Sequence, residues 1–300
     1  MKAEKSLMIF GAGYLGKVLG CAALEKGWRV LGLTRNAEKA KHLEASGFAK
    51  VWVADLATPD WWKAVAEVPD GVVNCVSSGG GGLEGYRHSY IGGNRSIMGW
   101  VAVHPERERF KRSTLIYTGS TGVYPDAAGD WVMEEEAREG DGGPRGDLLL
   151  DAERVVAEAA PSFFRRYFIL RLAGLYGPGR SFLINQVRER AVRGEPDSYL
   201  NLIRVEDAAD AILKSLDAAG ERADRIYNVA DGSPAKKEAI VEWLASELGM
   251  EGPFFDPERA VSWRAAKNRR ISTEAIRKEL GWEPQYSDYR KGLKPLLTSV

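Results

Sequence analysis

A glycine-rich turn between two apolar segments constrains this chain more than any other stretch. Residues Gly11–Gly16 fit the pattern Gly-x-Gly-x-x-Gly. The apolar run Leu7–Phe10 precedes them, an amphipathic segment extends to Lys26, and a second apolar run covers Trp28–Leu33. A strand, a glycine turn, a helix and a second strand form one βαβ unit, which is the context in which this motif binds a dinucleotide.

Each glycine has a separate physical task in such a turn. Gly11 permits the tight turn, Gly13 lets a pyrophosphate approach the backbone, and Gly16 lets the helix pack close to the strand. The backbone N–H groups at the start of the helix, at Tyr14 and Leu15, then face the phosphates at the positive end of the helix dipole. We predict that these five residues bind the pyrophosphate of the cofactor.

The residues after the second apolar run select the dinucleotide. An acidic residue here accepts hydrogen bonds from the ribose hydroxyls of NAD, whereas an arginine accommodates the 2′-phosphate of NADP. This chain carries Thr34 and Arg35 and no carboxylate at this point. Because a guanidinium suits bidentate phosphate contact, we predict NADP rather than NAD. The alternative is that Arg35 is only a solvated residue before the next helix.

The composition argues against several classes of function. Lys plus Arg and Asp plus Glu both number 42, so no net charge attracts nucleic acid or a membrane surface. No apolar run approaches the roughly 18 residues that a membrane-spanning helix needs. Cys21 and Cys75 are the two cysteines and, like the three dispersed histidines, show no metal-ligand spacing. We therefore predict no metal site and a reducing, cytoplasmic setting.

Strand and helix patterns alternate along the chain and predict an α/β fold with a Rossmann-type, doubly wound parallel sheet. We predict a dinucleotide-binding domain over residues 1–178, to which 201–231 return. A smaller C-terminal, substrate-side lobe would comprise 179–200 and 232–300. After the βαβ unit, the expected strands are 50–54, 71–76, 113–118, 167–172 and 226–230; the expected helices are 37–46, 60–68, 86–103, 147–159, 182–193, 206–218, 236–248 and 273–280; and 125–146 is a long loop.

Several further motifs, taken in order, resemble the extended short-chain dehydrogenases/reductases, the NAD(P)-dependent epimerase/dehydratase group. The pair Asp55-Leu56 is similar to the family pair whose carboxylate contacts the adenine amine, and Val76–Ser78 stands where the family has Ala-Ala beside the cofactor. The resemblance extends to segments 171–179, 203–209, 227–230 and 280–284, although Phe10 replaces a usual glycine and Arg204 a usual histidine. It adds these residues to the predicted cofactor site: Asp55, Leu56, Ser77, Ser78, Gly79, Ala173 and Gly174.

The catalytic pair of that family is missing. Family members carry Tyr-x-x-x-Lys on one helix, where the tyrosine moves the proton and the lysine holds the cofactor ribose. Aligning that helix by Ala152-Glu153 places Arg145 at the tyrosine position and Leu149 at the lysine position. No lysine occurs between Lys111 and Lys214, so the helix cannot carry the pair in any register.

Three residues are candidates for a substituted active site. Ser120 matches the family serine that orients the substrate oxygen. Tyr124 is the nearest phenol and a candidate acid, assisted by Ser120 or Thr121, or it only lines the pocket as its family equivalent does. Arg145 is the candidate cation beside that phenol, or it binds an anionic substrate such as a phosphate or carboxylate.

Three interpretations of the function remain. The first is an NADP(H)-dependent oxidoreductase or epimerase with a non-standard site, acting on a small, nucleotide-sugar-like carbonyl or hydroxyl substrate. The second is a catalytically inactive NAD(P)(H)-binding sensor or scaffold. The third is RNA or protein interaction through the basic segments 107–112 and 264–270, which lack the aromatic platforms that single strands need. We expect no nucleic-acid partner, and a homodimer through 86–103 by analogy with the family.

Overall fold

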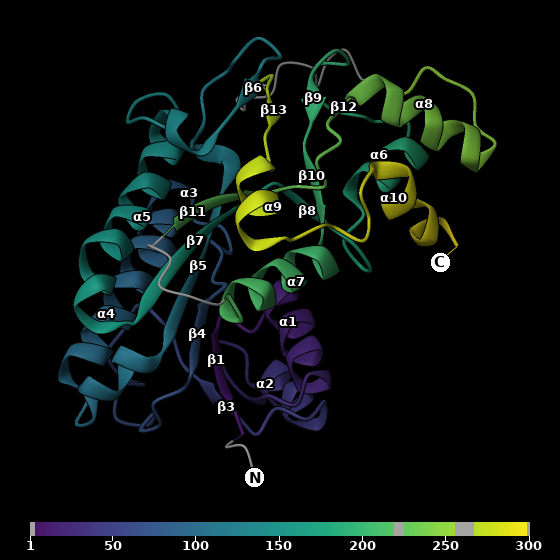
Figure 1. Ribbon diagram of the computed structural model, residues 1–300. Helices are drawn as coiled ribbons and strands as arrows, with labels where there is room; N and C mark the ends of the chain where they lie inside the picture. Colours follow the sequence, from purple (N-terminus) through teal and green to yellow (C-terminus); the bar gives the residue numbers. More distant parts are fainter. Residues whose placement is uncertain (1–3, 219–224, 256–266, 299–300) are drawn as a thin grey trace. The chain divides into compact units, whose positions relative to one another are not determined.

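The computed structural model describes residues 4–218, 225–255 and 267–298 (Figure 1). The chain forms two compact units. Unit 1 comprises residues 1–123, 138–171 and 209–227, and unit 2 comprises 124–137, 172–208 and 228–300. Our boundaries place 124–137 and 172–178 with the cofactor-binding domain, whereas the structure groups both segments with unit 2. The reason for 124–137 is that its short strand pairs with 270–271.

A parallel sheet of seven strands among the described residues confirms the predicted doubly wound fold. Its order is β11-β7-β5-β4-β1-β2-β3, so the direction of winding reverses between β1 and β4. Ligands of such sheets bind outside the carboxyl ends of the strands at this switch point. The strands are β1 (Ser6–Phe10), β2 (Arg29–Thr34), β3 (Lys50–Val53), β4 (Gly71–Asn74), β5 (Thr114–Ser120), β7 (Arg166–Leu172) and β11 (Arg225–Val229).

Helices cover both faces of this sheet (Figure 1). On one face α1 (Tyr14–Glu25) and α2 (Ala37–Ala45) pack on β1, β2 and β3. Lys26, directly after α1, forms an ion pair with Asp210 on α7 (Val205–Leu216), with 3.6 Å between Nζ and Oδ1. On the other face α4 (Gly93–Val103) packs against α5 (Gly143–Phe163). Strands buried on both faces must be apolar almost throughout, which the runs in β1 and β4 satisfy.

The predicted helix over 60–68 is wrong, because this segment forms turns. Three indole N–H groups account for its conformation. Trp61 Nε1 donates to Leu56 O at 3.1 Å, Trp62 Nε1 to Ser96 Oγ at 3.0 Å, and Trp100 Nε1 to Val65 O at 3.0 Å. These indole hydrogen bonds therefore hold the segment against the core and α4, and it does not form a regular helix.

The predicted single helix over 86–103 is divided into three pieces. A short α3 (Gly82–Tyr86) leads into a π-helical turn, η1 (Arg87–Gly92), and α4 follows it. Turns of this kind are rare and frequently occur at functional sites. Short 3-10 turns are η2 (Arg107–Arg112), η3 (Thr121–Val123) and η4 (Glu134–Glu136).

Helix α5 begins at Gly143, one turn before the predicted start, with Pro144 in its first turn. A buried ion pair joins α5 to β7. Arg171 donates through Nε and Nη2 to the two carboxylate oxygens of Glu153, at 2.9 and 2.7 Å. Removing one partner of such a pair leaves an uncompensated buried charge, so the pair fixes the rotation of α5 against the sheet.

Unit 2 has its own apolar core, built around Ile184, Ile240, Leu244 and Leu293. Short strand pairs surround it: β8 (Gly174–Tyr176) with β10 (Leu202–Arg204), β9 (Tyr199–Leu200) with β12 (Ala235–Lys236), and β6 (Trp131–Val132) with β13 (Arg270–Ile271). Its helices are α6 (Phe182–Arg188), α8 (Lys237–Leu248), α9 (Glu274–Leu280) and α10 (Tyr289–Leu297), the last of which the sequence patterns missed. No helix in the described residues is long and apolar enough to cross a membrane.

A buried carboxyl group in unit 2 makes its stability depend on pH. Asp231 is 2% exposed, and its Oδ1 accepts the Ser233 N–H at 2.9 Å. Burial raises the pKa of the Asp231 carboxyl to about 7; the Ser233 N–H opposes the shift, the charges of Asp288 and Asp207 add to it, and Arg277 opposes it. The folded chain therefore keeps a proton on Asp231 at pH values where the unfolded chain has released it.

We expect the free energy of unfolding to fall as pH rises from 5 to 7, because ionising Asp231 in the fold is unfavourable, and to level off above pH 7. This group contributes a fall of about 2 to 3 kcal/mol between pH 5 and pH 8. Urea unfolding at the two pH values, in wild type and Asp231→Asn, measures it; the variant should lose this part of the pH dependence. Asp130→Asn, whose side chain is 87% exposed, is the control. Equal pH dependence in wild type and Asp231→Asn would contradict the assignment.

Candidate cofactor and active site

The glycine turn after β1 is held in a close-packed conformation. Gly11 has φ +80°, which favours glycine, and its N–H donates to Leu33 O at 3.0 Å. A Cβ on Gly11 would lie 2.7 Å from Val76, and one on Gly16 would lie 2.7 Å from Gly11 O. At Gly13 the nearest such atom is 3.9 Å away. The first and third glycines thus serve packing, while the backbone at Gly13 has open space for a ligand.

The start of α1 borders that space and has no side-chain cap. Its N-terminal residue is Tyr14, no side chain caps Gly13, and the first turn carries no acidic residue. Leu15 is 6% exposed and anchors the turn in the core. Since the first N–H groups of a helix have no intrahelical partner, they suit an anion. The residues present therefore fit a pyrophosphate.

Arg35 lies across the neighbouring loop. It is exposed, and its Nη2 is 3.1 Å from the position that a Cβ on Gly79 would take. Thr34 is buried at the end of β2, where its Oγ1 accepts the Asn36 N–H at 3.4 Å. The structure thus brings the ends of β2 and β4 together around one accessible guanidinium.

Asp55 has a partner that the sequence did not suggest. His88, on the π-helical turn η1, places Nε2 3.0 Å from Asp55 Oδ2, and the Ala57 N–H donates to Oδ1 at 2.9 Å. Burial alone would raise the pKa of the Asp55 carboxyl, but the hydrogen bonds from His88 and Ala57 and the charges of His88 and Arg35 lower it below its ordinary value. Asp55 is therefore held as a carboxylate, the form that accepts a hydrogen bond from an adenine amine. Its neighbour Leu56 is 3% exposed and packs on α4.

A buried amide pair fixes the loop that carries Ser77, Ser78 and Gly79. Asn74 ends β4, and its Nδ2 donates to Asn94 Oδ1 at 2.7 Å while its Oδ1 accepts the Val76 N–H at 3.0 Å. Ser77 is exposed and Ser78 half-buried just beyond this anchor. Sequence reasoning missed the amide pair, although an asparagine inside two apolar patterns is an available signal.

Ala173 and Gly174 differ from the other predicted cofactor residues, because they belong to unit 2. There the Ala173 N–H donates to Val229 O at 3.0 Å and the Gly174 N–H to Asn201 O at 2.9 Å. Their assignment to the cofactor stays a prediction.

The region of the missing catalytic pair lies where β5 meets α5. Ser120 ends β5, and its Oγ accepts the Gly122 N–H at 3.1 Å. The first turns of α5 pack on this loop: a Cβ on Gly146 would lie 3.3 Å from Gly122 O, and one on Gly122 would lie 3.4 Å from Leu149 Cδ1. Leu149 therefore stands beside Ser120 where the family lysine is expected, and it brings no charge.

Arg145, at the family tyrosine position, stacks on a different tyrosine. Its Cζ is 5.3 Å from the centre of the Tyr86 ring, at the end of α3. Tyr86 in turn packs on Tyr90, with ring centroids 5.2 Å apart. Sequence reasoning did not single out Tyr86, because no spacing in the chain links it to Arg145.

Tyr124 belongs to unit 2 and has a buried partner. It is fully buried, and its hydroxyl donates to Asn228 Oδ1 at 2.6 Å. Its carbonyl oxygen accepts from Lys267 Nζ at 2.8 Å. This environment is that of a structural side chain, and the two roles predicted for Tyr124, an acid or a residue that lines the pocket, stay predictions.

The same contacts account for one of the two basic segments. Arg269 Nη1 donates to Pro125 O at 3.0 Å, and Arg270 Nε donates to Gly129 O at 2.7 Å. Burial lowers the pKa of the Arg269 guanidinium to about 10, against the charges of Asp126 and Tyr124. These cations hold the backbone of 124–129, whereas Arg264 lies outside the described residues.

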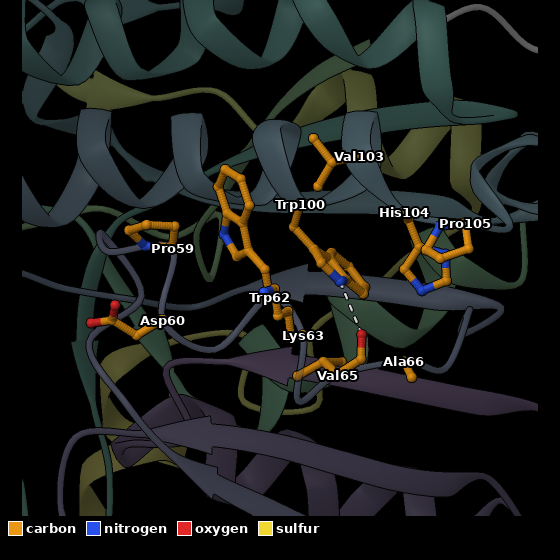
Figure 2. A pocket seen from close by; sticks show the side chains of 10 residues that line it. All are labelled: Pro59, Asp60, Trp62, Lys63, Val65, Ala66, Trp100, Val103, His104 and Pro105. Carbon is orange, nitrogen blue, oxygen red and sulfur yellow. Dashed lines mark hydrogen bonds between the residues drawn. The ribbon is translucent and has the colours of Figure 1, made fainter.

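A cavity of about 760 Å³ lies in unit 1, beside the C-terminal end of α4 (Figure 2). Figure 2 shows the Trp62 and Trp100 side chains at its centre and the hydrogen bond from Trp100 to Val65. No predicted site residue is among its lining residues, which are Pro59, Asp60, Trp62, Lys63, Val65, Ala66, Trp100, Val103, His104 and Pro105. In the described part of the chain, no group of three or more His, Cys, Asp and Glu side chains could hold a metal ion.

Comparisons with known proteins agree with this geometry. Over 294 residues the chain is 27% identical to the protein YeeZ of Escherichia coli K12, covering 95% of this chain and 97% of YeeZ. It is 24% identical over 304 residues to the dTDP-6-deoxy-L-talose 4-dehydrogenase (NAD(P)(+)) of Kitasatospora kifunensis, covering 96% of this chain and 93% of that enzyme. A conserved protein of unknown function from Silicibacter pomeroyi has a similar structure, with a TM-score of 0.74, 25% identity and 99% of each chain covered.

The family model that matches the chain is described as the NAD dependent epimerase/dehydratase family, and it covers residues 7–230. This range includes the glycine turn, the central sheet except for Ser6 at the start of β1, and the altered catalytic region. By its sequence and its fold, the chain belongs to the NAD dependent epimerase/dehydratase family.

Proposed function

We propose that this protein is an NADP(H)-dependent oxidoreductase that acts on a carbonyl or hydroxyl group of a small, anionic substrate. One observation carries the proposal: the open backbone at Gly13, the uncapped start of α1 and the guanidinium of Arg35 lie around the carboxyl ends of β1, β2 and β4. A cofactor site this complete supports retained use of a dinucleotide, although the family's catalytic pair is replaced.

The preference for NADP rests on charge at the adenosine end. A 2′-phosphate adds negative charge beside the ribose, and Arg35 supplies an exposed cation there while no carboxylate follows β2. An acidic residue in this place would repel the phosphate and select NAD.

The substrate class follows from the relatives and from Arg145. The relative from Kitasatospora kifunensis is named for the 4-dehydrogenation of a dTDP-deoxysugar. In this chain the guanidinium of Arg145 lies over the Tyr86 ring at the start of α5, and such a group binds phosphate or carboxylate. We therefore propose a nucleotide-sugar-like substrate. A dimer and a cytoplasmic location remain predictions.

The following residues of the chain would bind the cofactor and the substrate. The α1 N-terminus and Gly13 bind the pyrophosphate, Asp55 accepts from the adenine, and Arg35 neutralises the 2′-phosphate. Ser120 Oγ orients the substrate oxygen at the end of β5. When bound, the nicotinamide supplies or accepts the hydride. A sensor without turnover is the competing function, because Leu149 removes the lysine that holds the ribose in other members.

Arg35→Ala should weaken NADPH binding by about 10-fold to 100-fold, since one charge-assisted contact to phosphate is lost, while NADH binding changes little. Fluorescence titration of wild type and variant with both nucleotides measures this. Arg154→Ala, which removes a half-exposed guanidinium on α5, is the matched control and should bind both as wild type does. Equal weakening of NADPH and NADH in Arg35→Ala would contradict the 2′-phosphate assignment.

Wild-type protein with NADP⁺ and dTDP-6-deoxy-L-talose should form NADPH steadily, as followed by the absorbance of the reduced nicotinamide. Gly13→Val should abolish this reaction without unfolding the chain, because a side chain would fill the open space where the pyrophosphate approaches. Tight NADPH binding with no turnover of this or other nucleotide sugars would favour the sensor instead.

A further inference from the structure

The altered active site needs a proton donor, and the neighbouring tyrosines differ in their environments. Tyr124 donates its hydroxyl to Asn228 inside unit 2. Tyr117 on β5 is fully buried, and burial, with the charges of Glu153 and Tyr90, raises the pKa of its phenol well above the ordinary value. Both phenols are fully buried, so neither hydroxyl is open to a ligand.

Tyr86 has a different environment. It is half-buried at the end of α3, directly after the loop that follows β4, and directly before the π-helical turn η1. The guanidinium of Arg145 lies over its ring at 5.3 Å. A cation beside a phenol stabilises the negative charge that develops on the oxygen as the proton leaves. Arg145 itself stays protonated and cannot serve as the acid.

Packing contacts and a hydrogen bond link this pair to Ser120 within unit 1. Arg145 and Gly146 are neighbours in the first turn of α5, and Gly146 packs on the carbonyl of Gly122. The Gly122 N–H donates to Ser120 Oγ at 3.1 Å. The phenol of Tyr86, the guanidinium of Arg145 and the hydroxyl of Ser120 therefore belong to one contiguous group of packed residues.

We propose that Tyr86 is the proton donor of this protein and that Arg145 is its positioning cation. In the family the phenol and the cation both come from the helix that corresponds to α5. Here α5 supplies the cation at the former tyrosine position, and α3 supplies the phenol. This assignment rests on the proposed oxidoreductase function and goes beyond it, because it names how a chain without Tyr-x-x-x-Lys moves the proton.

The proton step balances as follows for carbonyl reduction with NADPH. The Tyr86 O–H bond breaks and its proton forms the new O–H bond on the carbonyl oxygen, while the carbonyl carbon is reduced by hydride and NADPH is oxidised to NADP⁺. Water then returns a proton to the Tyr86 oxygen. In the oxidation direction the deprotonated Tyr86 oxygen takes the proton from the alcohol.

Steady-state kinetics with NADP⁺ and dTDP-6-deoxy-L-talose test the role of the hydroxyl. Tyr86→Phe keeps the ring under Arg145 and removes the oxygen that takes the proton from the alcohol in this direction, so kcat should fall by at least about 100-fold while KM changes little. Tyr289→Phe, which deletes a phenol hydroxyl in the core of unit 2, should retain the wild-type rate. Arg145→Ala should lose activity that millimolar guanidinium partly restores, a result that a merely structural role would not give.

A second readout does not need turnover. With 3-fluorotyrosine placed at position 86, the ¹⁹F resonance should move when NADP⁺ saturates the protein, and again when Arg145→Leu removes the stacked cation. Wild-type activity that survives Tyr86→Phe would overturn the assignment and leave the proposed function standing. A fluorine resonance unmoved by bound NADP⁺ would overturn it as well. A wild-type chain that binds NADP⁺ without any turnover would overturn both.

Discussion

The close approach of the β1–α1 turn to its neighbours is the constraint on which the rest of unit 1 depends. No room exists for a Cβ at Gly11 against Val76, or at Gly16 against Gly11 O. These two contacts place the start of α1 directly above the switch point of the sheet, where its N–H groups face open space at Gly13. Arg35, Asp55 and the loop after β4 can contact a cofactor only if this turn holds the pyrophosphate between them.

A second constraint shapes the chemistry of the site. Leu149 and Arg145 replace the lysine and tyrosine of the family, so α5 presents an apolar side chain to the loop after β5 and a cationic side chain to Tyr86 on α3. Two buried interactions hold α5 in place. Glu153 forms an ion pair with Arg171, and the Asn94 side chain donates a hydrogen bond to the Ala152 carbonyl. The site has therefore kept the backbone framework of the family while its reacting side chains differ. The phenol of Tyr86 on α3 is the proposed substitute for the family tyrosine.

The sequence predicted the features that rest on local patterns. The glycine turn and the alternating strands and helices follow from spacing and apolar periodicity, the Asp55 carboxylate was implied by the resemblance to the family, and the doubly wound sheet is confirmed. Contacts between distant segments were not predictable. His88, on the π-helical turn η1, meets Asp55, and Tyr86, directly before that turn, meets Arg145. Likewise, 60–68 has the composition of a short helix, but three indole hydrogen bonds determine its turns.

Hydrogen–deuterium exchange with and without NADP⁺ tests the central claim most directly, because it reports the bound backbone without requiring a substrate. The account predicts slower exchange on binding in peptides that contain Gly11–Leu15, Arg35 and Ser77–Gly79. Protection confined to other parts of the chain, or no protection at the glycine turn at saturating NADP⁺, would contradict it.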